Sequence, residues 1–194
     1  MTSMKPELSP EWKRSLRDGV FVRGGDVSGR SFNRLDLTGL RVREPTARGS
    51  DFRACILDDV RIEGGSFVDA NFEGASIRGA VFFDTVLSGA CFDASGASGA
   101  SLATCICQGS RWRGADLTGA DLSAASFRGA DLTDAVLSKV RARGTSFVDA
   151  VLTNADLRDA DLRDANFLGA TLDGVRWDGA VLDGAAFDRG KEPE

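Results

Sequence analysis

The chain of 194 residues contains no histidine and no tyrosine, and it has only four prolines and four cysteines. Histidine is the most common general base of enzymes and the most common ligand of transition metals, so its absence argues against most acid–base and metal catalysis. No stretch approaches the roughly 20 apolar residues that cross a bilayer, and the first residues lack the apolar core of a signal peptide. We therefore expect a cytoplasmic protein that makes no contact with a membrane.

Motifs that would indicate catalysis or a bound cofactor are also lacking. The sequence contains neither GxGxxG nor GxxxxGK[ST], and it has no Cys-x-x-Cys pair. Cys55, Cys105 and Cys107 fall on positions that are assigned below to the interior, which favours buried reduced thiols over the alternatives, a disulfide or a metal site at Cys105 and Cys107. We expect no enzyme activity, no cofactor and no metal.

In contrast, a five-residue period runs through almost the whole chain. Every fifth residue from Val22 to Phe187 is Val, Leu, Ile, Phe, Trp, Ala or Cys, at all 34 positions. Two residues earlier the side chain is mostly small, with Ala at 17 of 34 positions, and two residues later Gly, Asp or Asn occupies 26 of 34. Gly, Asp and Asn are the residues that best tolerate a positive φ and a tight turn.

This period excludes a regular helix and a straight strand. Five residues advance an α-helix by about 500°, which would spread the apolar side chains around the whole cylinder. In a strand, an odd period would place the large residue on opposite faces in successive repeats. The chain must therefore turn once per repeat, with one small and one large apolar side chain pointing inward, and so wind into a coil whose turns stack.

The most regular repeats carry a specific motif, seen at Ala115-Asp116-Leu117, Ala120-Asp121-Leu122, Ala130-Asp131-Leu132, Ala155-Asp156-Leu157 and Ala160-Asp161-Leu162. This A(D/N)LXX pattern resembles the pentapeptide-repeat family. The resemblance implies an all-β fold, a right-handed quadrilateral parallel β-helix of about eight coils, which would be about 40 Å long at roughly 4.8 Å per coil. Four repeats per coil would stack large residues 20 apart, including the aromatic column from Phe32 to Trp112 and another from Phe127 to Phe187.

We expect three segments: an N-terminal tail and capping helix at 1–19, the β-helix at 20–189 and a C-terminal tail at 190–194. Ser9 is a suitable N-cap, Pro10 suits the first helical turn and Gly19 suits the end of the helix. The C-terminal residues predict no such helix, so the last coil is expected to be open or covered by a partner subunit.

Two places depart from the pattern. Pro45 and Arg30 occupy positions of the small inward series, which predicts a bulge or bend near residues 43–50. Ala97 replaces a large inward residue in the segment 93–99, which predicts thin packing there, with a hinge as the alternative.

The charge is uneven along the chain. Residues 1–115 carry 14 acidic and 15 basic side chains, whereas residues 116–188 carry 13 aspartates and only 7 basic residues. Within the family, Qnr-type and MfpA-type proteins bind DNA gyrase or topoisomerase IV by resembling B-DNA, and so protect these enzymes from quinolones or other poisons. The resemblance implies that this chain could act likewise. A duplex as long as residues 116–188, roughly 17 Å, would present about 10 charges.

The partner-binding residues predicted on this basis are outward aspartates of the C-terminal half. They are Asp116, Asp121, Asp131, Asp134, Asp149, Asp156, Asp159, Asp161 and Asp164. The alternative is that they serve solubility and corner geometry, and that the protein is a general interaction scaffold whose partner is not a topoisomerase.

Outward side chains suggest two other surfaces. Val148 and Leu168 are outward apolar residues 20 apart, which predicts an interface with a partner or in a homodimer. Outward arginines at positions 23, 41, 43, 48 and 53 would be needed for direct nucleic-acid binding, but acidic residues balance their charge, so we expect none.

Overall fold

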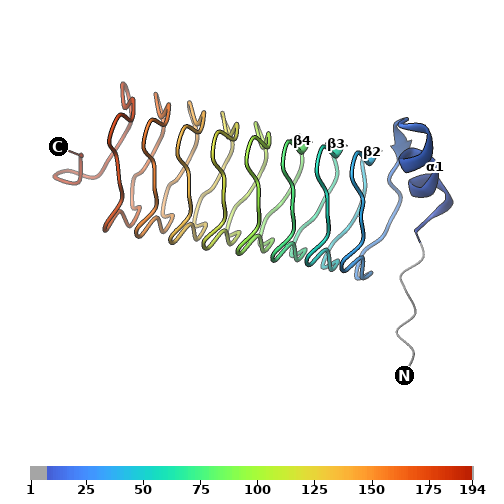
Figure 1. Ribbon diagram of the computed structural model, residues 1–194. Helices are drawn as coiled ribbons and strands as arrows, with labels where there is room; N and C mark the ends of the chain where they lie inside the picture. The colour runs from blue at the N-terminus through green and yellow to red at the C-terminus, as the bar shows by residue number, and fades with distance from the viewer. Residues whose placement is uncertain (1–7, 194) are drawn as a thin grey trace.

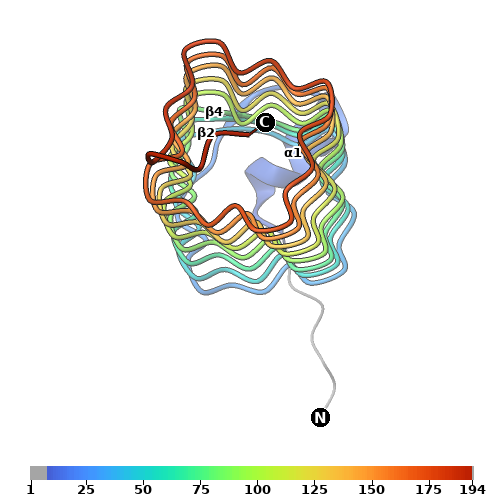
Figure 2. The same cartoon turned by 90° about the vertical axis from the view of Figure 1, so that its left-hand side faces the viewer.

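The computed structural model describes residues 8–193, which form a stack of coils closed at its N-terminal end by a helix (Figure 1). The expected tail at 1–7 and residue 194 lie outside the described residues. The coils form a right-handed quadrilateral β-helix, and the view along the stack shows them superimposed around one axis (Figure 2). Residues 20 apart are bridged in parallel from Asp26↔Thr46 to Asn166↔Ala186. Four five-residue repeats therefore make one coil, which confirms the expected number of sides.

Four short strands mark one side of the first coils: β1 (Val22–Arg23), β2 (Arg41–Arg43), β3 (Arg61–Glu63) and β4 (Val81–Phe83). They pair in parallel in the order β1-β2-β3-β4. We call this side of the β-helix the first side. It begins at residue 21 and recurs every 20 residues along the chain, at 41, 61, 81 and so on. The second, third and fourth sides follow it along the chain and begin at residues 26, 31 and 36.

Backbone groups find their partners in the coils on either side. The Asp116 N–H donates to the Ser95 carbonyl at 2.9 Å, and the Leu117 N–H donates to the Val136 carbonyl at 2.8 Å. Each corner requires a left-handed residue: all fifteen non-glycine residues with positive φ stand two positions after a large inward residue, for example Lys139 at 61° and Asp149 at 58°. The predicted role of the Gly/Asp/Asn series is thus confirmed, although Arg, Glu, Ala, Thr and Lys also occupy this position.

The interior is filled by the two apolar series. Phe72, Phe92 and Trp112 are buried and stacked, with ring centroids 4.5 and 3.9 Å apart. The second predicted column is also formed, since Phe147 stacks on Phe167 at 5.0 Å. Cys55, Cys105 and Cys107 are buried free thiols, as expected, and burial raises the pKa of Cys55 and Cys105 to about 11.

Helix α1 (Pro10–Asp18) covers the first coil. Ser9 caps it by accepting from the Trp12 N–H at 3.2 Å, and Gly19 ends it at a φ of 63°. Trp12 donates its indole N–H to the Gly24 carbonyl at 3.0 Å and stacks on Phe32. The Ser15 hydroxyl accepts from the Arg41 N–H and donates to the Arg41 carbonyl, each at 2.9 Å, at a residue that precedes the Val22↔Val42 start of the β1–β2 pairing. The helix therefore satisfies an edge that would otherwise be open.

The other end has no such cover among residues 8–193. The inward residues of the last coil, including Leu172, Trp177 and Phe187, are only partly buried. The Lys191 amine reaches the Ala170 carbonyl at 3.4 Å but leaves most of the coil uncovered. Within residues 8–193 the last coil is open, and its cover by a partner subunit stays a prediction.

The bulge predicted near residues 43–50 does not form. The Arg30 side chain is exposed, although its position belongs to the small inward series. Pro45 produces no bulge, since the register stays at 20 on both sides of it, at Arg43↔Glu63 and Thr46↔Ser66. Glycines make room instead: a Cβ on Gly65 would lie 2.5 Å from the Pro45 carbonyl oxygen.

The segment 93–99 shows no interruption of the ladder. The N–H groups of Gly96 and Ala97 donate to Ala75 and Asp116 at 3.0 and 2.7 Å. Thin packing around Ala97 stays a prediction. No helix within residues 8–193 combines the length and the apolar character that a membrane span requires.

Candidate functional site

The outer surface of the C-terminal coils is the first candidate site, and its geometry follows from the repeat. The residue just before each large inward residue points outward from the flat side, and the residue two positions after it stands at a corner. Four predicted aspartates stand just before a large inward residue and are half-buried: Asp121, Asp131, Asp156 and Asp161. Asp134, Asp149, Asp159 and Asp164 stand at corners and are exposed, as is Asp116 on the flat fourth side.

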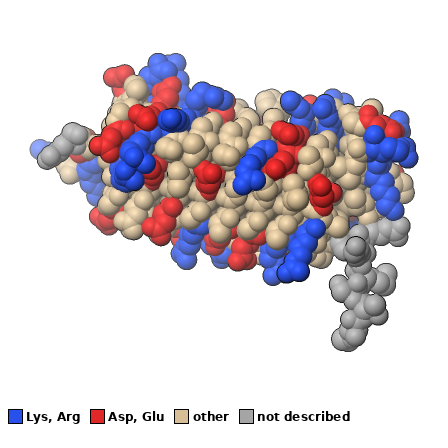
Figure 3. All heavy atoms as spheres, in the orientation of Figure 1, with Lys and Arg blue, Asp and Glu red and all other residues tan. Residues whose placement is uncertain are grey.

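Six of the nine predicted aspartates form ion pairs with arginines of the same coil or the next. The pairs are Asp121 with Arg141, Asp131 with Arg113, Asp149 with Arg128, Asp156 with Arg158, Asp161 with Arg163 and Asp164 with Arg143, all with N–O distances of 3.2 Å or less. Figure 3 shows this arrangement as red and blue side chains intermingled over the C-terminal end of the stack. The surface is therefore a mosaic and not a uniform acidic face.

The paired carboxylates are held in their charged form. The Arg158 guanidinium donates to Asp156 at 2.7 and 2.8 Å and lowers the pKa of this carboxyl below its usual value, against the opposing effect of burial. Arg163 lowers the pKa of Asp161 in the same way. A carboxylate that is already bound by a guanidinium is a weaker candidate for contact with a partner, because the partner must displace that guanidinium.

Six exposed aspartates of this half have no ion pair with any residue from 8 to 193. They are Asp116, Asp134 and Asp159 of the predicted set, together with Asp173, Asp178 and Asp183. Asp134 accepts a hydrogen bond from the Asn154 amide at 3.1 Å. We define the acidic surface as Asp116, Asp134, Asp159, Asp173 and Asp178, which lie on the adjacent third and fourth sides and at the corners that follow them.

The residues Asp173 and Asp178 were missed by the sequence reasoning, although the repeat contained a signal for them. Both directly follow a large inward residue, at Leu172 and Trp177, and this position is exposed in every repeat from Arg163 to Asp183. The A(D/N)LXX pattern contains the aspartate before the large residue, and at this position arginines of the same or a neighbouring coil pair with it. The unpaired carboxylates instead concentrate after it.

The predicted interface residues lie together but differ in exposure. Val148 is half-buried, whereas Leu168 has 42% of its surface exposed. The bridge between Ser146 and Asn166 places the two side chains on neighbouring coils of the second side.

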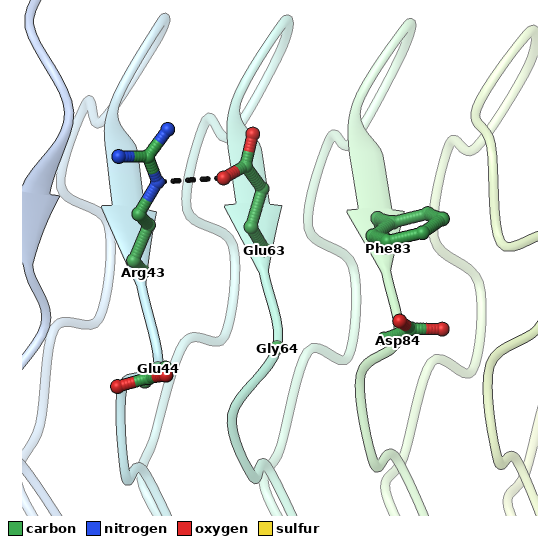
Figure 4. Close-up of a pocket in the computed structure, with 6 residues that line it drawn as sticks. All are labelled: Arg43, Glu44, Glu63, Gly64, Phe83 and Asp84. Carbon is green, nitrogen blue, oxygen red and sulfur yellow. Dashed lines mark hydrogen bonds and ion pairs between the residues drawn. The ribbon is translucent and has the colours of Figure 1, made fainter.

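A second candidate site lies on the first side, over β2 to β4. An open hollow of about 460 Å³ is lined by Arg43, Glu44, Glu63, Gly64, Phe83 and Asp84. Figure 4 shows the Arg43 guanidinium turned toward Glu63, with Phe83 projecting from the next strand. The Arg43 Nε lies 2.6 Å from the Glu63 carboxylate, and the Arg43 guanidinium also covers the Phe21 ring at 4.5 Å.

Among the described residues, fold and surface together define a solenoid with a packed apolar interior and charged side chains on the outer surface. A family model described as "Pentapeptide repeat region" matches residues 110–187, and one described as "Pentapeptide repeats (8 copies)" matches residues 66–95. The chain belongs to the pentapeptide-repeat family.

Solved structures of the same fold are similar to this chain. Trypsin-treated QnrB1, described as a plasmid-mediated fluoroquinolone resistance protein, is 24% identical with a TM-score of 0.50, and the match covers 88% of this chain and 93% of that one. HetL, a pentapeptide repeat protein involved in heterocyst differentiation regulation in the cyanobacterium Nostoc sp. strain PCC 7120, is 25% identical with a TM-score of 0.45, covering 90% and 92%. No curated protein matches the chain.

Proposed function

We propose that this protein is a non-enzymatic binder of DNA gyrase or topoisomerase IV that occupies the DNA-binding surface of the enzyme and so protects it from quinolones or other poisons. The observation that carries the proposal is the acidic surface on a straight stack of coils. Its five carboxylates are exposed and lack ion pairs among the described residues, so they are available to the lysines and arginines that normally contact DNA phosphates.

The magnitude of the charge supports the same proposal. Internal ion pairs leave the net charge of residues 116–188 unchanged, at 13 aspartates against 7 basic residues. This difference is within a factor of two of the roughly 10 charges on a duplex of equal length. QnrB1 is described as a fluoroquinolone resistance protein, which agrees with this function, and it shares the elongated fold of this chain.

A competing function is a general protein-interaction scaffold in the cytoplasm. The six ion pairs favour it, because a surface on which arginines alternate with aspartates presents fewer free negative charges than duplex DNA does. In either case we propose Val148 and Leu168 as a contact for a partner subunit or for a second copy of the chain.

Competition with DNA distinguishes the two functions. Fluorescently labelled protein is titrated with purified gyrase and followed by fluorescence anisotropy, and a linear DNA duplex is then added. We expect the duplex to displace the protein, and we expect the affinity to fall as the salt concentration rises, because the contacts are between charges. Simultaneous binding of the protein and the duplex, or no binding to gyrase, would favour the scaffold.

A further inference from the structure

The first side carries two arginines that no carboxylate balances. Arg41 and Arg61 are Cα partners on the neighbouring strands β2 and β3, so their Cα atoms are about 4.8 Å apart. Neither forms an ion pair or a side-chain hydrogen bond with any described residue, whereas Arg23 and Arg43 beside them are paired with Glu44 and Glu63. Like charges directly opposite each other destabilise a sheet. The pair is thus a local cost of the fold, which a bound anionic group would remove.

Apolar surface continues from this pair of arginines along the same side. Val81 follows Arg61 on the next strand, and Phe83 stands beside Val81 with 51% of its surface exposed, the largest exposure among the large hydrophobic residues of the described chain. The hollow of Figure 4 ends at Phe83, and an adjoining hollow of about 380 Å³, lined in part by Phe21 and Val22, shares Arg43 and Glu44 with it. The two hollows together extend from β1 to β4, beside the outward positions of Arg41, Arg61 and Val81 on the same side.

We infer that this surface, Arg41, Arg61, Val81 and Phe83, binds an extended protein segment in which an aspartate or glutamate lies next to an aromatic or aliphatic residue. The carboxylate is bound by the two guanidinium groups, which donate several charge-assisted hydrogen bonds. The apolar side chain packs on Val81 and Phe83. The partner is a protein, and the surface is separate from the acidic surface of the C-terminal coils.

Carboxylates in the depression favour a protein segment over a nucleic acid. Glu44, Glu63 and Asp84 line the same hollow. A nucleic acid carries a phosphate at every nucleotide and would bring several of them against these carboxylates. A peptide can place a single carboxylate over Arg41 and Arg61 and keep neutral residues elsewhere.

The test uses a displayed library of random 12-residue peptides and the immobilised full-length protein. We expect enriched peptides to contain Asp or Glu next to an aromatic or aliphatic residue. For synthetic copies, the double substitution Arg41→Gln, Arg61→Gln should weaken binding at least tenfold, and Phe83→Ser should weaken it similarly. Ile106→Ser, an apolar residue of the second side with a comparable 42% exposure, is the matched control and should change nothing.

Two further measurements separate binding from folding. If the arginine pair is a local cost, the double Gln variant should unfold at the same temperature as the unmodified protein or higher, so lost binding cannot be ascribed to unfolding. A fluorescein-labelled dT20 oligonucleotide reports nucleic-acid binding. Failure to enrich any peptide, enriched peptides without acidic residues, equal binding by the double variant, or oligonucleotide binding that depends on Arg41 and Arg61 would overturn the inference.

Discussion

Replacing Phe92 by alanine is expected to lower the free energy of unfolding by about 3–5 kcal/mol. The ring is fully buried and lies between two others, with Phe72 at 4.5 Å and Trp112 at 3.9 Å. Its removal leaves a cavity that the neighbouring coils cannot close, because the backbone ladder holds their spacing at about 4.8 Å. The loss therefore includes the contacts of both neighbouring rings and not only the transfer of one side chain to water.

Urea unfolding followed by circular dichroism measures this effect. Phe83→Ala is the matched control, since this ring is half exposed on the first side, and it should change the stability by no more than about 0.5 kcal/mol. Equal losses for the two variants would contradict the solid core, because they would mean that the inner column contributes no more than an outer side chain.

Neutralising the acidic surface is expected to weaken binding to gyrase at least tenfold without unfolding the protein. The variant combines Asp116→Asn, Asp159→Asn, Asp173→Asn and Asp178→Asn, all of exposed carboxylates without an ion pair among the described residues. Asparagine keeps the size of the side chain and tolerates the positive φ of 58° at position 159. Only the charge available to the partner is removed.

The control for this variant removes the same amount of charge from the N-terminal coils. It combines Asp59→Asn, Asp69→Asn, Glu73→Gln and Asp84→Asn, which are also exposed and outside ion pairs with the described chain. Anisotropy titration with gyrase should give the unmodified affinity for the control. Equal weakening by both variants would mean that the overall charge of the protein matters and that the acidic surface has no specific role.

Most of the fold could be predicted from the sequence because one spacing determines it. A large apolar residue at every fifth position, with Gly, Asp or Asn two positions later, requires a coil, and the stacked aromatic columns follow from four repeats per coil. The bulge predicted from Arg30 and Pro45 is absent for a physical reason. A long charged side chain can leave an inward position by turning outward, and the two glycines next to Pro45 in the stack absorb its ring, but neither adjustment changes the repeat.

The candidate site was less predictable, because its properties depend on contacts between coils. Asp131 pairs with Arg113 and Asp149 with Arg128, at separations of 18 and 21 residues. Which arginine pairs with which aspartate depends on side-chain geometry at the corners. The five-residue period alone does not determine it. The unpaired arginines Arg41 and Arg61 are the exception, since their spacing of 20 places them side by side as soon as the number of sides is known.

Gyrase supercoiling in the presence of a quinolone tests the central claim most directly. Relaxed plasmid, gyrase and an inhibitory concentration of the drug are incubated with increasing amounts of the protein, and cleaved and supercoiled DNA are separated on a gel. A DNA-like binder is expected to reduce the drug-stabilised cleavage and to restore supercoiling, and at higher concentration to inhibit supercoiling by itself. Cleavage and supercoiling that stay unchanged up to micromolar protein would contradict the claim that the acidic coils occupy the DNA-binding surface of the enzyme.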